Sequence, residues 1–147
     1  MDHKDDGLRA LITEARHGVV ATLKRDGRPQ LSTVGFTAEK AAEKDAGLLR
    51  FTTTADRAKV HNLRRDPRVS VHVTGPHPWA YAVAEGAAEL SDVATAPGDP
   101  VLAELVEVYR AIGGEHPDWD DYRRAMVADR RLVVRIRVDR VYGIPAT

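Results

Sequence analysis

A run of three threonines followed by two cations is the part of this chain whose side chains and spacing best suit binding chemistry. Residues 52–54 end an extended run, and Arg57 and Lys59 follow closely. Asp56 is expected to be the N-cap of a short helix over residues 57–65. Exposed N–H groups at a helix start favour an anion, and Arg or Lys supplies the compensating charge. The segment therefore predicts a phosphate site, and the alternative is a solvated basic helix that joins two strands.

The elements that must position these residues follow from hydrophobic periodicity and turn signals. Asp26-Gly27 between two extended runs predicts a hairpin, and Gly86 predicts a bulge or bend in a long strand. Gly18 is expected to end the first helix. The expected helices are 7–17, 57–65, 101–112 and 117–129, the expected strands are 19–23, 29–37, 48–54, 69–74, 79–90 and 132–138, and residues 38–47 are expected to form a polar hairpin tip.

The predicted order of elements indicates the fold class. Consecutive strands joined by hairpins or short helices imply an antiparallel sheet, and six strands in one small unit suggest a closed or half-open barrel. The prediction is a mainly β protein with flanking helices. With 147 residues and no linker or internal repeat, residues 1–147 are expected to form a single domain.

Composition excludes several function classes. Lys plus Arg is 22 and Asp plus Glu is 22, which argues against a general binder of nucleic acid or anionic membrane. There is no cysteine, and the histidines lack the spacing of metal ligands, so no metal site is expected. No nucleophile motif surrounds Ser32 or Ser70, which argues against a hydrolase. Neither a signal peptide nor a membrane-spanning run is evident, so a soluble cytoplasmic protein is expected.

Several motifs together resemble one known superfamily. Residues 18–23 and 26–32 resemble the opening of the pyridoxamine 5′-phosphate oxidase-like superfamily, which comprises flavin and deazaflavin proteins with a split β-barrel. Residues 57–68 resemble its phosphate-binding segment, and residues 79–86 resemble the following strand, which ends in Glu-Gly. Residues 114–122 resemble a narrower actinobacterial subgroup that uses coenzyme F420. The resemblance covers nearly the whole chain and implies a six-stranded antiparallel split β-barrel.

The resemblance also implies a homodimer that binds its cofactor in a groove between the subunits. Two cations suit a phosphate, and amide or hydroxyl groups suit the polar edge of the cofactor ring. By this likeness Arg57 and Lys59 hold the phosphate, together with Thr52 and the backbone at Ala58. The ring and ribityl chain are lined by Gln30, Ser32 and Thr33. Asn62 reaches the cofactor from the helix, and Trp79 and Tyr81 of the partner subunit pack against it.

For some of these residues the chain leaves a simpler role open. Trp79 and Tyr81 also suit a barrel core or a dimer interface, and Gln30 and Ser32 also suit ordinary strand positions. Three further residues are expected to pack helices rather than bind a cofactor: Trp119, Tyr122 and Met126.

The activity that the resemblance implies is an F420-dependent oxidoreductase. A reduced deazaflavin would transfer hydride to a small electron-poor substrate such as a conjugated tetrapyrrole, quinone or nitroaromatic, and the cofactor would do the difficult chemistry itself. That fits a chain without an evident acid, base or nucleophile cluster, and we assign no catalytic residue or proton donor.

Two alternatives keep the same fold. One is an FMN-binding pyridoxamine phosphate oxidase-like oxidoreductase, and the other is a non-catalytic F420 carrier. Residues 143–147 lack the Arg and His pattern of true pyridoxamine phosphate oxidases, which favours the deazaflavin branch. FMN ends at its phosphate, whereas F420 continues into a lactyl and oligoglutamyl tail. A groove left open beyond Arg57 and Lys59, with extra cations, would therefore favour F420.

Overall fold

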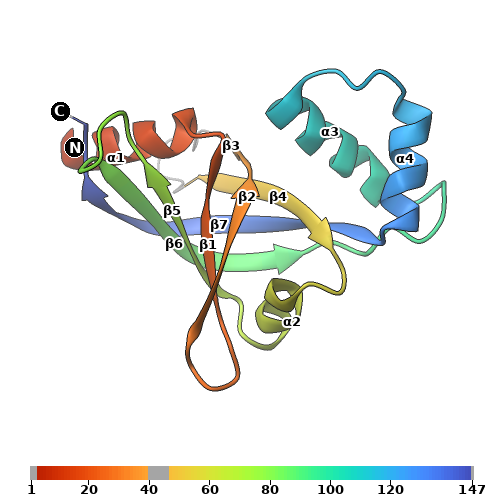
Figure 1. Cartoon of the computed structure of the whole chain (residues 1–147), viewed down its shortest axis with the longest axis horizontal. Coiled ribbons are helices and arrows are strands. Elements are labelled where there is room, and N and C mark those ends of the chain that lie inside the picture. Colours follow the sequence, from red (N-terminus) through yellow and green to blue (C-terminus); the bar gives the residue numbers. More distant parts are fainter. Residues whose placement is uncertain (1–2, 40–46, 147) are drawn as a thin grey trace.

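The computed structural model describes residues 3–39 and 47–146. Within these residues it has seven strands in one antiparallel sheet and four helices (Figure 1). The helices are α1 (His3–Glu14), α2 (Ala58–Arg65), α3 (Val101–Gly113) and α4 (Trp119–Ala128), and the strands are β1 (His17–Leu23), β2 (Pro29–Gly35), β3 (Thr37–Glu39), β4 (Leu48–Thr54), β5 (Arg68–Thr74), β6 (Tyr81–Leu90) and β7 (Arg131–Ile144).

The sheet curls into a half-barrel because its two edge strands are neighbours in the chain. The strand order is β2-β1-β5-β6-β7-β4-β3, so β2 and β3 lie at opposite edges although Phe36 alone separates them. The edges must therefore come together at Phe36, whose side chain is buried. The expected split barrel is confirmed. The expected count of six strands is wrong, because the run 29–37 divides at Phe36 and its second part pairs with β4 instead of β1.

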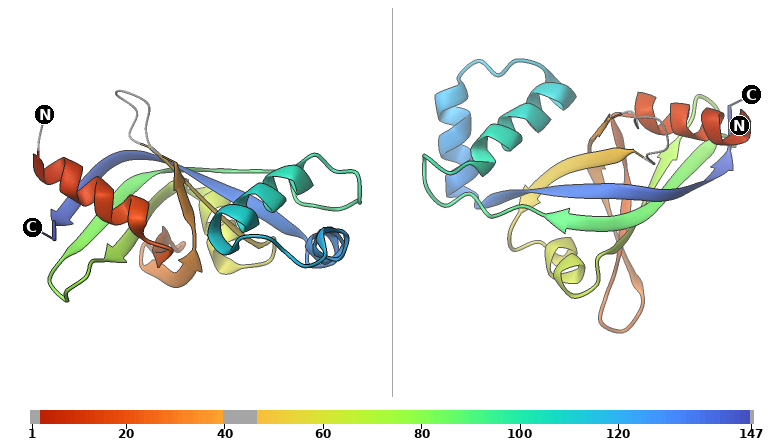
Figure 2. Two further views of the ribbon diagram at one scale, coloured as in Figure 1. Left: turned by 90° about the horizontal axis from the view of Figure 1, so that it is seen from above. Right: turned by 180° about the vertical axis from the view of Figure 1, so that it is seen from behind.

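The two faces of the sheet have different coverings. The inner face packs with α1 and α2 in the main core, to which β1 contributes Val20 and β4 contributes Phe51. On the outer face, α3 and α4 form a second core with Val133 of β7. Strands β6 and β7 run the length of the molecule, with α1 at one end and the α3–α4 hairpin at the other (Figures 1 and 2).

An ion-pair network holds α3 on the outer face. The guanidinium of Arg50 in β4 is buried and pairs with Glu104 and Glu107 of α3 at 3.3 and 3.0 Å. Arg135 of β7 also pairs with Glu104, and with Glu89 at 2.8 Å. Arg50 and Arg135 are therefore both neutralised by carboxylates.

Two glycines confirm local predictions. Gly27 has φ +88° in the β1–β2 hairpin, where the N–H of Lys24 donates to the carbonyl of Arg28 at 2.9 Å. The register between β6 and β7 shifts at Gly86, which is the expected bulge. A Cβ at Gly86 would lie 1.9 Å from the carbonyl oxygen of Arg137, so the close backbone approach requires glycine.

The expected N-terminal helix and the expected helix cap were misplaced. The helix spans His3–Glu14 rather than 7–17, and Gly18 lies in β1, where a Cβ would lie 2.8 Å from the carbonyl oxygen of His72. Asp56 is not the N-cap residue of α2: that position is taken by Arg57, and the carboxylate of Asp56 accepts a hydrogen bond from Thr54 at 2.8 Å instead.

The start of β6 and the end of β7 also differ from the expectation. Trp79 lies before β6 in a turn closed by the N–H of Ala80 and the carbonyl of His77. The last strand continues beyond residue 138 to Ile144 because the bulge restores its pairing with β6. Most of the expected hairpin tip at residues 38–47 lies outside the described residues. Among those that are described, no helix is long and apolar enough to cross a membrane.

Candidate functional site

The start of α2 presents free backbone donors beside basic side chains. Arg57 is the N-cap residue, with φ −70° and ψ 147°, and no side chain caps the helix. The first turn holds no acidic residue, and Lys59 is half-buried there. Uncapped N–H groups, beginning with Ala58 at the first helical position, carry the partial positive charge of a helix start. The predicted phosphate segment therefore has the geometry of an anion site.

A third cation reaches this site from β7. The β4–β7 register places Thr54 opposite Arg131, so the two side chains share the outer face. The Nη1 of Arg131 donates to the hydroxyl of Thr52 at 3.4 Å, and its Nε is buried without a hydrogen-bond partner. An unsatisfied buried donor costs about 1–3 kcal/mol. Arg131 was not predicted from the sequence, where its only signal is a basic pair at the start of the last strand.

Positive charge accumulates around Lys59, which feels the charges of both Arg57 and Arg131. The pKa of Lys59 is lowered, first by burial and then by the charges of Arg57 and Arg131. In the described part of the chain, none of the three forms an ion pair. Asp56 is nearby, but a hydrogen bond from Thr54 occupies its carboxylate and lowers its pKa. The site therefore suits an anion that carries more than one negative charge.

A hollow continues from Arg57 toward the end of α4. Its volume is about 490 Å³, and it lies between the turn before α2 and the turn after α4. Arg57 and Arg130 supply its cations, and Asp56 and Asp129 supply its carboxylates. Arg130 adopts a left-handed conformation with φ +53°, and its carbonyl accepts from the N–H of Ala55 at 2.9 Å. The anion site thus opens into a polar hollow of balanced charge.

Two of the predicted ligands, Asn62 and Gln30, are joined to each other through Thr22. Asn62 is buried, and its Nδ2 donates to the hydroxyl of Thr22 at 3.1 Å; that hydroxyl donates to Gln30 Oε1 at 3.2 Å. Arg65 donates to Asn62 Oδ1 at 3.1 Å and to the carbonyl of Leu23 at 2.7 Å. The Nδ2 of Asn62 therefore ties α2 to β1, whereas its Oδ1 holds Arg65 of the same helix, which in turn bonds to the end of β1.

The three predicted residues of β2 do not share a face. Gln30 and Ser32 are half-buried on the inner side, whereas Thr33 is exposed on the outer side. Ser32 pairs in register with Val20 of β1, and its hydroxyl is buried without a hydrogen-bond partner. One molecule on one face of β2 can therefore contact Gln30 and Ser32 or Thr33, but not all three.

The two predicted aromatic ligands, Trp79 and Tyr81, lie at the end of the sheet opposite the anion site. Trp79 is 77% exposed, and Tyr81 stacks on His72 with ring centroids 5.4 Å apart. Tyr81 pairs with Ile144, the last residue of β7, whereas the anion site adjoins Arg131, its first residue. At about 3.3 Å per residue, the two groups are separated by roughly 40 Å along the strand. One copy of the chain therefore cannot bring them to one cofactor.

The aromatic residues of α4 pack within the α3–α4 hairpin. Tyr122 and Met126 belong to the second core, and Trp119 packs against it. The hydroxyl of Tyr122 donates to the carbonyl of Leu105 at 3.0 Å, and burial raises the pKa of Tyr122 to about 12. This bears out the expected packing role. The part of the chain that the structure describes contains no cluster of three or more His, Cys, Asp or Glu side chains that could hold a metal ion.

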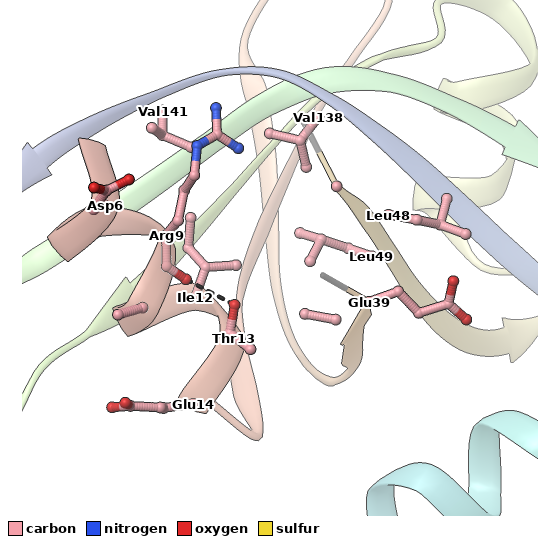
Figure 3. A pocket seen from close by; sticks show the side chains of 13 residues that line it. Asp6, Arg9, Ile12, Thr13, Glu14, Glu39, Leu48, Leu49, Val138 and Val141 are labelled. Carbon is pink, nitrogen blue, oxygen red and sulfur yellow. Dashed lines mark hydrogen bonds between the residues drawn. The ribbon is translucent and has the colours of Figure 1, made fainter. Parts of the chain in front are cut away.

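A separate cavity of about 430 Å³ lies between α1 and the β3–β4 edge (Figure 3). Ile12 on the helix faces Leu49 and Val138 across it, and Arg9 lies at its rim. None of the cofactor-binding residues predicted from the sequence lines this cavity, so the cavity is distinct from the anion site.

Comparison with known proteins identifies the family. The chain is similar to the solved structure of an F420 reductase, with a TM-score of 0.67 and 26% identity over 92% of this chain and 96% of that chain. It is similar to a conserved hypothetical protein from Mycobacterium tuberculosis, with a TM-score of 0.69 and 25% identity over 99% of this chain and 85% of that one. A FAD-binding protein from Mesorhizobium loti shares the fold, with a TM-score of 0.60 and 20% identity over 90% and 86% of the two chains. The pyridoxamine 5′-phosphate oxidase family model matches residues 5–144, and the chain therefore belongs to that family.

Proposed function

We propose that this protein is an oxidoreductase that binds coenzyme F420 and passes hydride to a small electron-poor organic substrate. The observation that carries the proposal is the anion site at α2, which opens into a further hollow beyond Arg57. FMN would end at that site, whereas the F420 phosphate continues into a tail that needs space beyond it. Arg130 on the wall of the hollow is a cation available to tail carboxylates. The similarity to an F420 reductase supports the same cofactor.

The residues at the site fit the phosphate of either cofactor. Arg57, Lys59 and the backbone at Ala58 would hold it, and Thr52 would complete the cradle. When bound, the deazaflavin supplies two-electron hydride chemistry. The task of the chain is then to bind, orient and shield the reacting groups, with a conjugated tetrapyrrole, quinone or nitroaromatic as the class of acceptor.

We further propose that the protein functions as a homodimer. Leu31, Tyr142 and Ile144 are exposed, and Leu31 is 61% exposed. The strand registers place Tyr142, Thr33 and Leu31 on the same outer face of the sheet. Exposed apolar side chains gathered on one face are typical of an interaction surface. A second copy on this face would cover them and would bring its own aromatic residues toward the anion site of the first.

Binding titrations test the cofactor assignment. F420 and FMN are titrated separately into the pure protein while tryptophan fluorescence is recorded, for the wild type and for Arg57→Gln and Lys59→Gln. Loss of one charge-assisted contact is expected to weaken F420 binding about tenfold or more. Lys24→Gln, in the β1–β2 hairpin, is the control and should bind as the wild type does. Tighter binding of FMN than F420 would replace the proposed cofactor, and binding of neither would refute the assignment.

Two further measurements separate the remaining possibilities. Reduced F420 is mixed with quinone and nitroaromatic acceptors, and its absorbance is followed. Turnover supports the oxidoreductase, whereas tight binding without turnover of any acceptor would identify a cofactor carrier instead. Sedimentation of Leu31→Glu tests the dimer: a charge placed on the apolar face should give monomers, and an unchanged dimer would show that another face makes the contact.

A further inference from the structure

We propose that Arg131 binds the cofactor phosphate directly, as the third cation of the site formed by Arg57 and Lys59. The inference rests on the proposed function, because it assigns a ligand to the same site. Arg131 comes from the first position of β7 and therefore joins the end of the α3–α4 hairpin to the cofactor site.

The neighbours of Arg131 show that a structural role does not account for its guanidinium. Arg50 and Arg135 lie on the same outer face of β4 and β7, and each pairs with two or more carboxylates. Arg131 has no ion pair among the described residues. Its hydrogen bond to Thr52, at 3.4 Å, is longer than the usual 2.9–3.0 Å. Of the arginines on this face of β4 and β7 that are buried or half-buried, Arg50 and Arg135 are thus neutralised by carboxylates, and Arg131 is not.

The position of Arg131 relative to α2 explains why its guanidinium has no carboxylate partner in the described part of the chain. The β4–β7 register fixes it beside Thr54, at the point where the chain turns into α2. Its charge acts on Lys59: the pKa of Lys59 is lowered chiefly by burial, then by the charge of Arg57 and then by that of Arg131. Like charges brought together repel, so a cluster that lacks a carboxylate partner is stabilised when a multiply charged anion binds. A phosphate held between Lys59 and Arg131 would remove this repulsion.

The test compares two arginines of one strand. Arg131→Gln and Arg137→Gln make the same chemical change on the same face of β7, and Arg137 is exposed and remote from α2. Each variant is titrated with F420 and with FMN by fluorescence. Arg131→Gln is expected to weaken binding of the preferred cofactor about tenfold or more, whereas Arg137→Gln should leave it unchanged. Arg131→Lys keeps the charge but loses the planar fork, so an intermediate affinity is expected.

A second measurement uses inorganic phosphate, which does not depend on the cofactor ring. Phosphate should raise the Tm of the wild type and of Arg137→Gln more than that of Arg131→Gln, because a ligand stabilises the state that binds it. The Tm of each protein without phosphate identifies any variant that is simply less stable. Equal phosphate shifts and equal cofactor affinities for wild type and Arg131→Gln would overturn the inference.

The failures of the two proposals are distinguishable. If Arg57→Gln loses cofactor binding and Arg131→Gln keeps it, the inference on Arg131 is wrong and the proposed function stands. If the wild type binds neither cofactor, the proposed function is wrong, and the phosphate measurement alone decides on Arg131. A phosphate shift that Arg131→Gln abolishes would then support it as an anion ligand, and a shift absent from the wild type would overturn it.

Discussion

Replacement of Asn62 by alanine separates a structural role from a cofactor contact. In the structure its amide donates to Thr22 and accepts from Arg65, both at 3.1 Å, and the side chain is buried. Because both ends of the amide are engaged, we expect Asn62→Ala to lower the free energy of unfolding and to leave cofactor affinity nearly unchanged.

The magnitude follows from the bonds lost. The buried bond to Thr22 is worth about 1 kcal/mol net. The bond from Arg65 adds about 0.5–1 kcal/mol, since Arg65 is exposed and keeps its bond to the carbonyl of Leu23. Alanine is the better helix former by roughly half a kcal/mol, which offsets part of the loss. The net loss is therefore about 1–1.5 kcal/mol, or a fall in Tm of roughly 3–5 °C for a chain of this length.

Urea denaturation of wild type, Asn62→Ala, Thr22→Val and the double variant measures this loss and its origin. If the two side chains stabilise the protein through their shared bond, the double variant should be less destabilised than the sum of the singles, by about 1 kcal/mol. His61→Ala, an exposed neighbour on the same helix, is the control and should change the free energy of unfolding by less than about 0.5 kcal/mol. An Asn62→Ala protein of unchanged stability that binds F420 tenfold more weakly would refute the structural role.

Two other predictions concern stability. Gly86→Ala should lower the free energy of unfolding by about 2–3 kcal/mol or more, because the new Cβ would overlap the carbonyl of Arg137. The control Gly98→Ala, which has open space around it, should be nearly neutral. Equal urea midpoints for the two variants would contradict this prediction. The pKa of Glu104 is lowered, chiefly by the hydrogen bond from Arg135, so its stabilising effect is complete above its unfolded pKa of about 4.5 and disappears as pH falls through the lower folded value. Stability measured from pH 6 to pH 3 should therefore fall less steeply for Glu104→Gln than for wild type, and identical slopes would show that the pair does not contribute.

Local features of the fold were predictable because nearby residues determine them. Asp26-Gly27 predicts its hairpin since glycine supplies the positive φ that the turn needs. Gly86 predicts its bulge for a related reason, the close approach of the β7 backbone. The break at Phe36 was not predictable, because the run 29–37 is extended on both sides of it and only the pairing partner changes.

The candidate site was predictable to the extent that it lies on one continuous segment. Thr52, Arg57 and Lys59 lie on the continuous segment that runs from β4 into α2, and their types indicate an anion. Arg131 joins them only through the register of β4 on β7, which no short-range pattern encodes. Asn62 shows the opposite case: its type and position suit a ligand, but its actual partner, Thr22, is on a strand far away in the sequence.

The separation of the anion site from Tyr81 along β7 makes the proposed dimer testable without a structure of it. In a two-fold dimer each copy gives its α2 end to one site and its Tyr81 end to the other, so every site needs residues from both copies. Arg57→Gln and Tyr81→Ala dimers should each bind F420 weakly. After the two are mixed and their subunits exchanged, a mixed dimer carries both changes in one site and none in the other, so about a quarter of all sites should regain wild-type affinity. Failure to regain any tight binding, although mass spectrometry shows mixed dimers, would mean that Tyr81 and Arg57 of different copies do not share a site.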